Sequence, residues 1–290
     1  MVYERHDSEW VDAPELAPLG PTPFSSSYEI SVDDAARAQG ATACLPFQPL
    51  SFRDFMLYEQ HNIRASRGLV ERFHPIQHRV TSAWESATGK TFPLFRPNAL
   101  FYRQPMYYMS NHVTFVPSTT PISAPGYSSA LDFELELGFA LARPLRNATP
   151  QEAVQAIGAF VVLNDLSARD VQRAEMSSGF GPQKAKHFAS SLSETAVTAE
   201  GLLDRIDAIT GTVAINGTVI SEVTSAGMQW TLGEMLAHAS ASETLRPGEL
   251  FGTGTLPGGS GMELGYWLQP GDHLTLTLDG IGTIEHGIVA

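Results

Sequence analysis

The feature that most constrains the fold is a run of alternating acidic and apolar residues at 131–139, Leu-Asp-Phe-Glu-Leu-Glu-Leu-Gly-Phe. Side chains that are two residues apart in a β-strand point to the same face. The run therefore predicts a strand with Asp132, Glu134 and Glu136 on one face and apolar side chains on the other. The apolar face requires a core, so the acidic face must meet either solvent or positive charge.

A second acidic group follows a second apolar run, Phe-Val-Val-Leu at 160–163, which delivers Asp165 at its end. Clustered carboxylates repel and desolvate one another, and a divalent cation is the usual remedy. The two acidic groups therefore indicate a metal site. The alternative is a solvated strand face with unrelated ion pairs.

Composition narrows the classes of partner. The chain has 290 residues, of which 43% are hydrophobic, enough for one large core or two modest ones. Its net charge of −13 argues against nucleic acid and anionic membranes as partners and leaves a small molecule. The single cysteine, Cys44, fits a reducing compartment, and the polar first residues lack the apolar segment of a signal peptide. We therefore expect a cytoplasmic protein.

Local signals divide the chain into an irregular arm, residues 1–50, and a main domain, residues 51–290. The arm carries one helix candidate, capped by Ser31 and ending at Gly40. Residues 51–88 are expected to be mostly helical with a break at Pro75, and residues 113–116 to form a strand.

From residue 128 onward the pattern is dominated by strands. Helices are expected at 150–157 and 231–239, a strand at 159–164, and a hairpin turning at Asn216-Gly217. Two further strands, 274–278 and 282–289, meet around Asp279-Gly280. These elements predict an α+β fold built on a large, mostly antiparallel sheet system.

Several motifs resemble those of the fumarylacetoacetate hydrolase (FAH) family. Residues 132–139 are similar to its D-x-E-x-E strand, and residues 164–172, Asn-Asp-Leu-Ser-Ala-Arg-Asp-Val-Gln, to its N-D-x-S-A-R-D-x-Q signature. Further matches follow in family order, namely Gly181-Pro182 with Lys186, the segment 246–255, and Gly271-Asp272. The resemblance implies a mixed β-sandwich roll, or pseudo-barrel, with flanking helices over residues 51–290, and a homodimer.

Carried over position by position, the resemblance also implies a site. The metal carboxylates would be Asp54, Glu134, Glu136 and Asp165, a set of oxygen ligands that favours Mg²⁺, or else Ca²⁺ or Mn²⁺. The catalytic group would contain His61, its partner Glu263, and Lys186. The substrate cavity would be lined by Tyr108, Gln172 and Thr255.

The chain departs from the family at the substrate end of this site. Met56 and Met176 stand where two tyrosines near the family's substrate carboxylates are expected, so both become candidate substrate contacts. The arginine expected soon after the histidine has only Arg64 and Arg67 as candidates. Because methionine is adaptable and apolar, these changes predict a substrate less anionic or bulkier than fumarylacetoacetate.

The function implied is metal-dependent hydrolysis of a carbon–carbon bond in a 1,3-dicarbonyl compound, such as a β-diketone or an acylpyruvate. His61 would take a proton from water, and Lys186 would stabilise the developing negative charge. Two alternatives stay open: a decarboxylase or isomerase of keto-enol acids on the same metal, and a non-catalytic, metal-stabilised binding protein. Plainer readings also remain, with Glu263 a solvated loop acid, Gln172 and Arg169 helix-surface residues, and Tyr108 part of the core.

Overall fold

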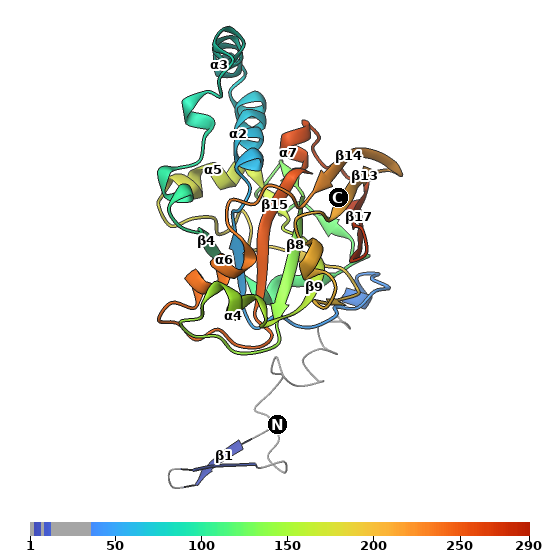
Figure 1. The fold of residues 1–290 in the computed structure, drawn as a ribbon. Coiled ribbons are helices and arrows are strands. Elements are labelled where there is room, and N and C mark those ends of the chain that lie inside the picture. Colours follow the sequence, from blue (N-terminus) through green and yellow to red (C-terminus); the bar gives the residue numbers. More distant parts are fainter. Residues whose placement is uncertain (1–2, 7–8, 13–35) are drawn as a thin grey trace.

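The structure, a computed structural model, describes residues 3–6, 9–12 and 36–290 (Figure 1). Strands β1 (Tyr3–His6) and β2 (Glu9–Asp12) pair as an antiparallel ladder. Residues 36–38 are helical and Gly40 has a φ of 98°, as expected for the end of the predicted helix. Its predicted start at Ser31 lies outside the described residues.

The site-bearing sheet is the largest of the four in the described residues, and its strands run in the order β4-β3-β15-β8-β9-β11-β5, with β12 pairing β9. Neighbours are antiparallel except β3 with β15 and β5 with β11. Its strands are β3 (Phe52–Phe55), β4 (Tyr107–Ser110), β5 (Phe115–Pro117), β8 (Glu134–Leu141), β9 (Ile157–Asn164), β11 (Ser190–Leu192), β12 (Val197–Thr198) and β15 (Leu250–Ser260).

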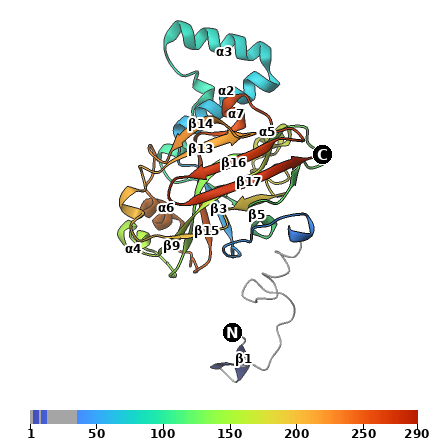
Figure 2. The same cartoon turned by 90° about the vertical axis from the view of Figure 1, so that its right-hand side faces the viewer.

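The second sheet packs beside the first (Figure 2) and has the order β14-β13-β16-β17-β6. Apolar side chains from both sheets form one core, for example Leu137 and Phe139 of β8 with Leu276 and Ile284 of the second sheet. A short ladder, β7 (Leu131–Asp132) with β10 (Ser167–Ala168), lies next to β8 in the chain. The second sheet contains β6 (Ile122–Ser123), β13 (Thr210–Ile215), β14 (Thr218–Thr224), β16 (His273–Leu278) and β17 (Gly282–Val289).

Helices gather at the two ends of the large sheet (Figure 1). At one end lie α2 (Glu59–Phe73), α5 (Arg169–Ser177) and α7 (Gly261–Leu264), with α3 (Pro75–Thr88) projecting beyond α2. At the other end lie α4 (Pro150–Val154) and α6 (Leu232–Ala239). Short 3₁₀ turns complete the chain at η1 (Pro93–Phe95), η2 (Ala99–Tyr102), η3 (His112–Thr114) and η4 (Leu203–Arg205).

The α+β class is confirmed, and so are several local signals. Thr149 and Thr231 each form a complete capping box, and Pro75 begins α3 directly after α2 ends. Asn216 and Gly217 take the positive φ angles, 52° and 77°, that the hairpin turn requires.

Two expectations were wrong in part. Residues 52–55 form strand β3 rather than helix, because all four side chains are buried between β4 and β15. The strand expected at 113–116 begins at Phe115, since residues 112–114 form η3, which Asn111 caps.

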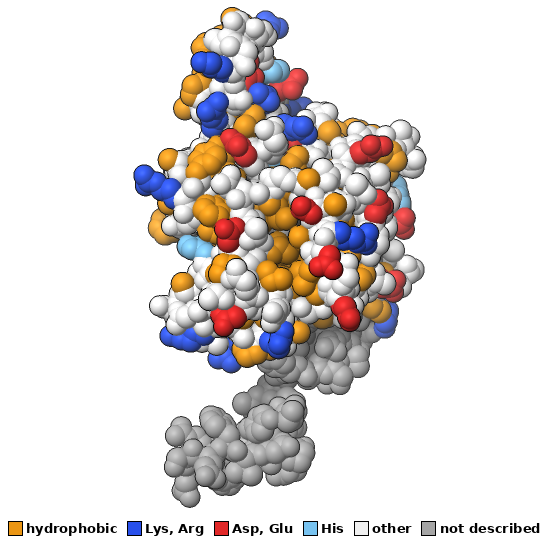
Figure 3. Space-filling model, in the orientation of Figure 1, with side chains coloured by type: hydrophobic (Ala, Val, Ile, Leu, Met, Phe, Trp, Pro, Cys, Tyr) orange, Lys and Arg blue, Asp and Glu red, His pale blue; other side chains and the backbone are white. Residues whose placement is uncertain are grey.

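The surface in Figure 3 carries its acidic side chains scattered over the face rather than gathered in one patch, with apolar side chains between them over β8 and β15. Among the described residues, no helix is both long and apolar enough to cross a membrane.

Candidate active site

Four carboxylates, the carboxylate cluster of Asp54, Glu134, Glu136 and Asp165, lie close together although three strands supply them. Asp54 is in β3, Glu134 and Glu136 are in β8, and Asp165 directly follows β9. All four are buried. Asp165 is linked to the rest through Lys186, whose Nζ bonds both Asp165 and Glu134.

Strand β15 runs between β3 and β8, and its Gly252 leaves room for carboxylates on either side. A Cβ atom at position 252 would lie 2.5 Å from Oε2 of Glu136 and 2.8 Å from Oδ1 of Asp54. Both distances are shorter than a van der Waals contact allows. The two carboxylates can therefore approach each other across β15 only because residue 252 has no side chain.

Two buried cations hold Glu134 in its charged form. Arg169 donates from Nη2 to Oε1 of Glu134 at 2.6 Å, and Lys186 donates to Oε2. Burial by itself raises the pKa of Glu134, but Arg169 and Lys186 outweigh it and bring that pKa below the usual value. Burial lowers the pKa of Lys186, but the charges of Asp165 and Glu134 raise it by more. The net pKa lies above the usual value for lysine, so this amine stays protonated. The acidic face of β8 therefore meets positive charge, not solvent.

Asp54 and Glu136 lack such compensation. Oδ1 of Asp54 and both carboxylate oxygens of Glu136 are buried with no hydrogen-bond partner among the described residues. Burial raises the pKa of both groups, and neighbouring carboxylates, Asp165 for Asp54 and Asp54 for Glu136, raise it further. Orphaned carboxylate oxygens are the donors that a hard divalent cation takes.

The chemical type of these oxygen donors suits a divalent cation, but their present positions do not form a coordination site. Across the described ranges, no group of three or more His, Cys, Asp or Glu side chains is placed to hold a metal ion as it stands. Lys186 instead bridges Glu134 and Asp165, at 2.7 Å from Oδ2 of Asp165. Metal uptake would therefore require the carboxylates to adjust, with Gly252 leaving them space.

A histidine–glutamate pair stands beside the carboxylate cluster. His61, on α2, approaches Oε1 of Glu263 with Nδ1 at 2.6 Å, although the two residues are 202 positions apart. Glu263, on α7, has a side chain only 1% exposed, and it accepts hydrogen bonds from the Gly258 amide at 2.9 Å and the Ser260 hydroxyl at 3.2 Å. It is not a solvated loop acid. Nε2 of His61 points to the other side, 3.9 Å from Oε1 of Glu134.

Tyr108 reaches the same cluster from β4. Its hydroxyl donates to Oδ2 of Asp165 at 2.5 Å, and Ser190 donates to Oδ1 at 3.1 Å. Burial and the Asp165 charge raise the pKa of Tyr108, which keeps it a donor. Tyr107 instead packs against Phe55, with ring centroids 4.7 Å apart.

One cavity of about 720 Å³ joins these groups. Its lining includes all of the sequence-predicted site residues except Asp165, which Tyr108 bonds, and Glu263, which His61 contacts. The predicted residues that do line it are Asp54, Met56, His61, Tyr108, Glu134, Glu136, Gln172, Met176, Lys186 and Thr255.

Sequence reasoning missed the importance of two residues, Asp132 and Arg169. Arg169 is 1% exposed, and its Nε donates to Asp132 at 2.8 Å while its Nη1 donates to Gln172 at 2.8 Å. Asp132 also accepts from the Met262 amide at 3.1 Å, so it ties α7 to α5. Arg169 belongs to the N-D-x-S-A-R-D-x-Q motif, which was the available signal.

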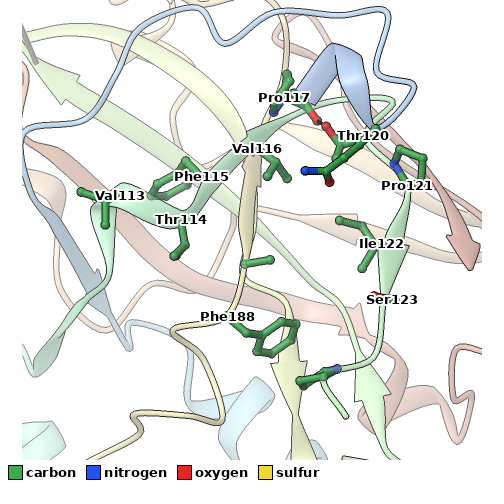
Figure 4. A pocket seen from close by; sticks show the side chains of 14 residues that line it. Val113, Thr114, Phe115, Val116, Pro117, Thr120, Pro121, Ile122, Ser123 and Phe188 are labelled. Carbon is green, nitrogen blue, oxygen red and sulfur yellow. Dashed lines mark hydrogen bonds between the residues drawn. The ribbon is translucent and has the colours of Figure 1, made fainter. Parts of the chain in front are cut away.

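A second cavity, of about 590 Å³, lies beside β5 and β6 (Figure 4). Val116, Ile122 and Phe188 are among its mostly apolar lining (Figure 4), and none of the described lining residues is charged. It offers no group for acid–base or metal chemistry.

Several known proteins are similar to this chain. Residues 88–289 match the model of the Fumarylacetoacetate (FAA) hydrolase C-terminal family. The chain is 31% identical over 179 residues to the oxaloacetate tautomerase YcgM of Escherichia coli K12, covering 61% of this chain and 78% of that protein. It is 24% identical over 246 residues to an E. coli 4-hydroxyphenylacetate degradation bifunctional isomerase/decarboxylase, covering 77% of this chain and 55% of that protein.

The chain spans about two thirds or less of the length of several curated relatives. Among solved structures, fumarylpyruvate hydrolase from Pseudomonas aeruginosa in complex with Mn²⁺ and pyruvate superposes with a TM-score of 0.61. That match has 17% identity and covers 86% of this chain and 93% of the other, so it supports the fold. The family match over residues 88–289, together with the shared fold, assigns the chain to the fumarylacetoacetate hydrolase family.

Proposed function

We propose that the protein hydrolyses a carbon–carbon bond of a 1,3-dicarbonyl acid with the help of a divalent cation. The observation that carries this proposal is the His61–Glu263 pair, whose free Nε2 faces the edge of the carboxylate cluster. Hydrolysis needs a base for water at that position. Glu263, held by two further hydrogen bonds, orients the imidazole for it.

The cation would be held by the carboxylate cluster. The Mn²⁺ in the P. aeruginosa fumarylpyruvate hydrolase structure makes Mn²⁺ the first ion to test, followed by Mg²⁺, which also prefers oxygen ligands. When bound, a hard divalent cation polarises the carbonyl oxygens of the substrate as a Lewis acid. Lys186 is protonated and buried, and it faces the same cavity, so it stabilises negative charge that develops on the substrate.

The protein's own groups then account for the proton movements. Glu263 accepts a hydrogen bond from Nδ1–H of His61, which leaves the Nε2 lone pair free to take a proton from water. The hydroxide adds to the carbonyl carbon, and the carbon–carbon bond breaks with its electron pair passing to the departing fragment as an enolate. The Nε2–H of His61 returns the proton to that fragment.

A second candidate is keto-enol tautomerisation or decarboxylation at the same site, because those activities appear in the names of relatives. Neither reaction strictly needs an activated water. The products separate the candidates: hydrolysis of an acylpyruvate yields pyruvate and a carboxylic acid, decarboxylation releases carbon dioxide, and tautomerisation changes only the enol absorbance.

The test is therefore a product assay on simple acylpyruvates and oxaloacetate with Mn²⁺ or Mg²⁺ present. If hydrolysis is correct, wild-type protein forms pyruvate and acid in equal amounts, and His61→Ala lowers kcat by about 10²–10⁴-fold. Glu263→Gln should also lower kcat, since Nδ1 of His61 loses its anionic partner. Preserved turnover in His61→Ala would instead point to decarboxylation or isomerisation.

A non-catalytic, metal-stabilised binding protein is the remaining alternative. Absence of every product with each cation, together with cation binding by calorimetry, would support it. The homodimer and the cytoplasmic location stay predictions from sequence, and sedimentation velocity of the purified protein measures the first of them.

A further inference from the structure

Part of the lining of this cavity is built from sulfur and aromatic side chains. Met56, Met106, Met109 and Met176, here called the methionine wall, line the cavity and come from the end of β3, from β4 and its approach, and from α5. Four of the eight methionines in the chain thus surround one site, which is a concentration that core packing alone does not require.

Phe180 extends this wall to the mouth of the cavity. Its side chain is 85% exposed, and Met176, one turn earlier at the end of α5, is 52% exposed. Large apolar side chains left in solvent at the rim of a cavity are suited to cover an apolar group that enters it.

The lysine and one of the two histidines that line the cavity already have carboxylate partners. Lys186 bonds Glu134 and Asp165, and His61 bonds Glu263. The remaining imidazole of the lining, His187, has a buried Nε2 with no hydrogen-bond partner among the described residues, so it offers one hydrogen bond but no permanent charge. No arginine is among the described residues that line the cavity.

The two arginines that sequence analysis considered are not available either. Arg67 forms a two-pronged ion pair with Glu85 of α3, with both N–O distances at 2.9 Å. Arg64, also on α2, is exposed and does not line the cavity. A substrate carboxylate that lies against the methionine wall would therefore lose part of its hydration and find no permanent counter-charge there, which is unfavourable.

We propose that the substrate carries an uncharged, apolar group, such as an aryl or alkyl chain, at the end opposite its 2-oxo acid. The dicarbonyl end lies at the carboxylate cluster, and the apolar end lies against the methionine wall, whose flexible, polarisable side chains adapt to its shape. This inference rests on the proposed function for the orientation of the dicarbonyl end.

The test compares two ligands of nearly equal size, benzoylpyruvate and its para-carboxy derivative. Binding of each to the Mn²⁺-loaded protein is measured by calorimetry, independently of turnover. We expect benzoylpyruvate to bind at least tenfold more tightly. The variant Met176→Lys, which places a cation at a half-exposed position on the wall, should narrow or reverse that ratio.

The matched control is Val219→Lys, at a 54% exposed position on β14 that does not line the cavity, and it should leave the ratio unchanged. Equal binding of the two ligands by wild-type protein, or tighter binding of the para-carboxy compound, overturns the inference while leaving hydrolysis possible. Failure of both ligands to bind overturns the proposed function itself.

Discussion

At the scale of single residues, the site depends on groups that would be unstable without their neighbours. Glu134 is kept ionised by Arg169 and Lys186, whereas Asp54 and Glu136 have raised pKa values and unpaired oxygens. A residue without any functional group, Gly252, separates the last two. The chemistry of the cluster therefore depends on free space as much as on charge.

Gly252→Ala tests that dependence. The added Cβ displaces the carboxylate ends of Glu136 and Asp54, which are flexible, so the fold should survive while Mn²⁺ affinity falls by about 10–100-fold. Calorimetric titration with Mn²⁺ measures it. Gly126→Ala, where a Cβ meets nothing within 4 Å, is the control. Equal affinities in the two variants would argue against a metal site between β3 and β8.

Contacts between individual side chains were also the hardest feature to predict from the sequence. The alternation in 131–139 predicted which side chains share a face, but the cations that compensate them, Arg169 and Lys186, come from other segments. Charge compensation across such separations leaves no periodic trace. The pairing of His61 with Glu263 was predicted from the order of the family motifs and not from their spacing. In the structure, Nδ1 of His61 lies 2.6 Å from Oε1 of Glu263.

At the scale of elements, α5 is anchored by one buried ion network rather than by an apolar face. Arg169 at its first turn bonds Asp132 of β7 and Glu134 of β8, and both acids are buried. Burial raises the pKa of Asp132, and Arg169 offsets part of that rise. The network fixes the start of the helix that carries Gln172 and Met176 into the cavity.

Arg169→Met should therefore be strongly destabilising. It leaves buried Asp132 without its cation and Glu134 with Lys186 alone, which costs about 3–5 kcal/mol in the free energy of unfolding. Urea denaturation followed by circular dichroism gives the value. Arg173→Met, on the exposed side of the same helix, serves as the matched control and should cost little. A loss of similar size in both variants would show that α5 is held by something other than this network.

Elements with strong local signals were predictable, and those fixed by distant partners were not. Capping boxes, Pro75 and the Asn216-Gly217 turn act within a few residues, so the pattern alone defines them. Strand β3 has four buried residues and no alternation, and its partner β15 lies about 200 positions later. Pairing with β4 and β15, and no signal within residues 52–55 themselves, makes this segment a strand, so local reasoning predicts helix there.

At the scale of the whole molecule, the two sheets are joined by a buried polar contact as well as by apolar packing. His286 of β17 is fully buried, with Nδ1 2.7 Å from the Thr120 carbonyl and Nε2 2.8 Å from the Ser191 hydroxyl of β11. Burial lowers the pKa of His286 to about 4, while the Thr120 carbonyl works against that shift.

This predicts acid-sensitive packing. In the unfolded chain a histidine takes up a proton near pH 6.5, whereas in the folded protein His286 stays neutral down to about pH 4. The contribution of His286 to stability should therefore fall by about 3 kcal/mol as pH drops through this range, with no further loss from this group at lower pH. Urea midpoints between pH 7 and pH 4 measure the slope.

His286→Gln removes the titrating group while keeping hydrogen-bonding capacity, so its slope over that range should be shallower than that of wild-type protein. His273→Gln, on the exposed side of β16, should keep most of the wild-type slope. An unchanged slope in His286→Gln would assign the acid sensitivity to other groups.

The parallel pairing of β3 with β15 has a consequence for how the molecule is made. Leu250 lies opposite Phe52, so the strand that carries Asp54 has no neighbour on that side until most of the chain has left the ribosome. Contacts this remote along the polypeptide are slow to form. The catalytic cavity is accordingly one of the last regions to assemble, and nascent chains that end before β15 leave one edge of β3, with Phe52 and Phe55, unpaired for chaperones to shield.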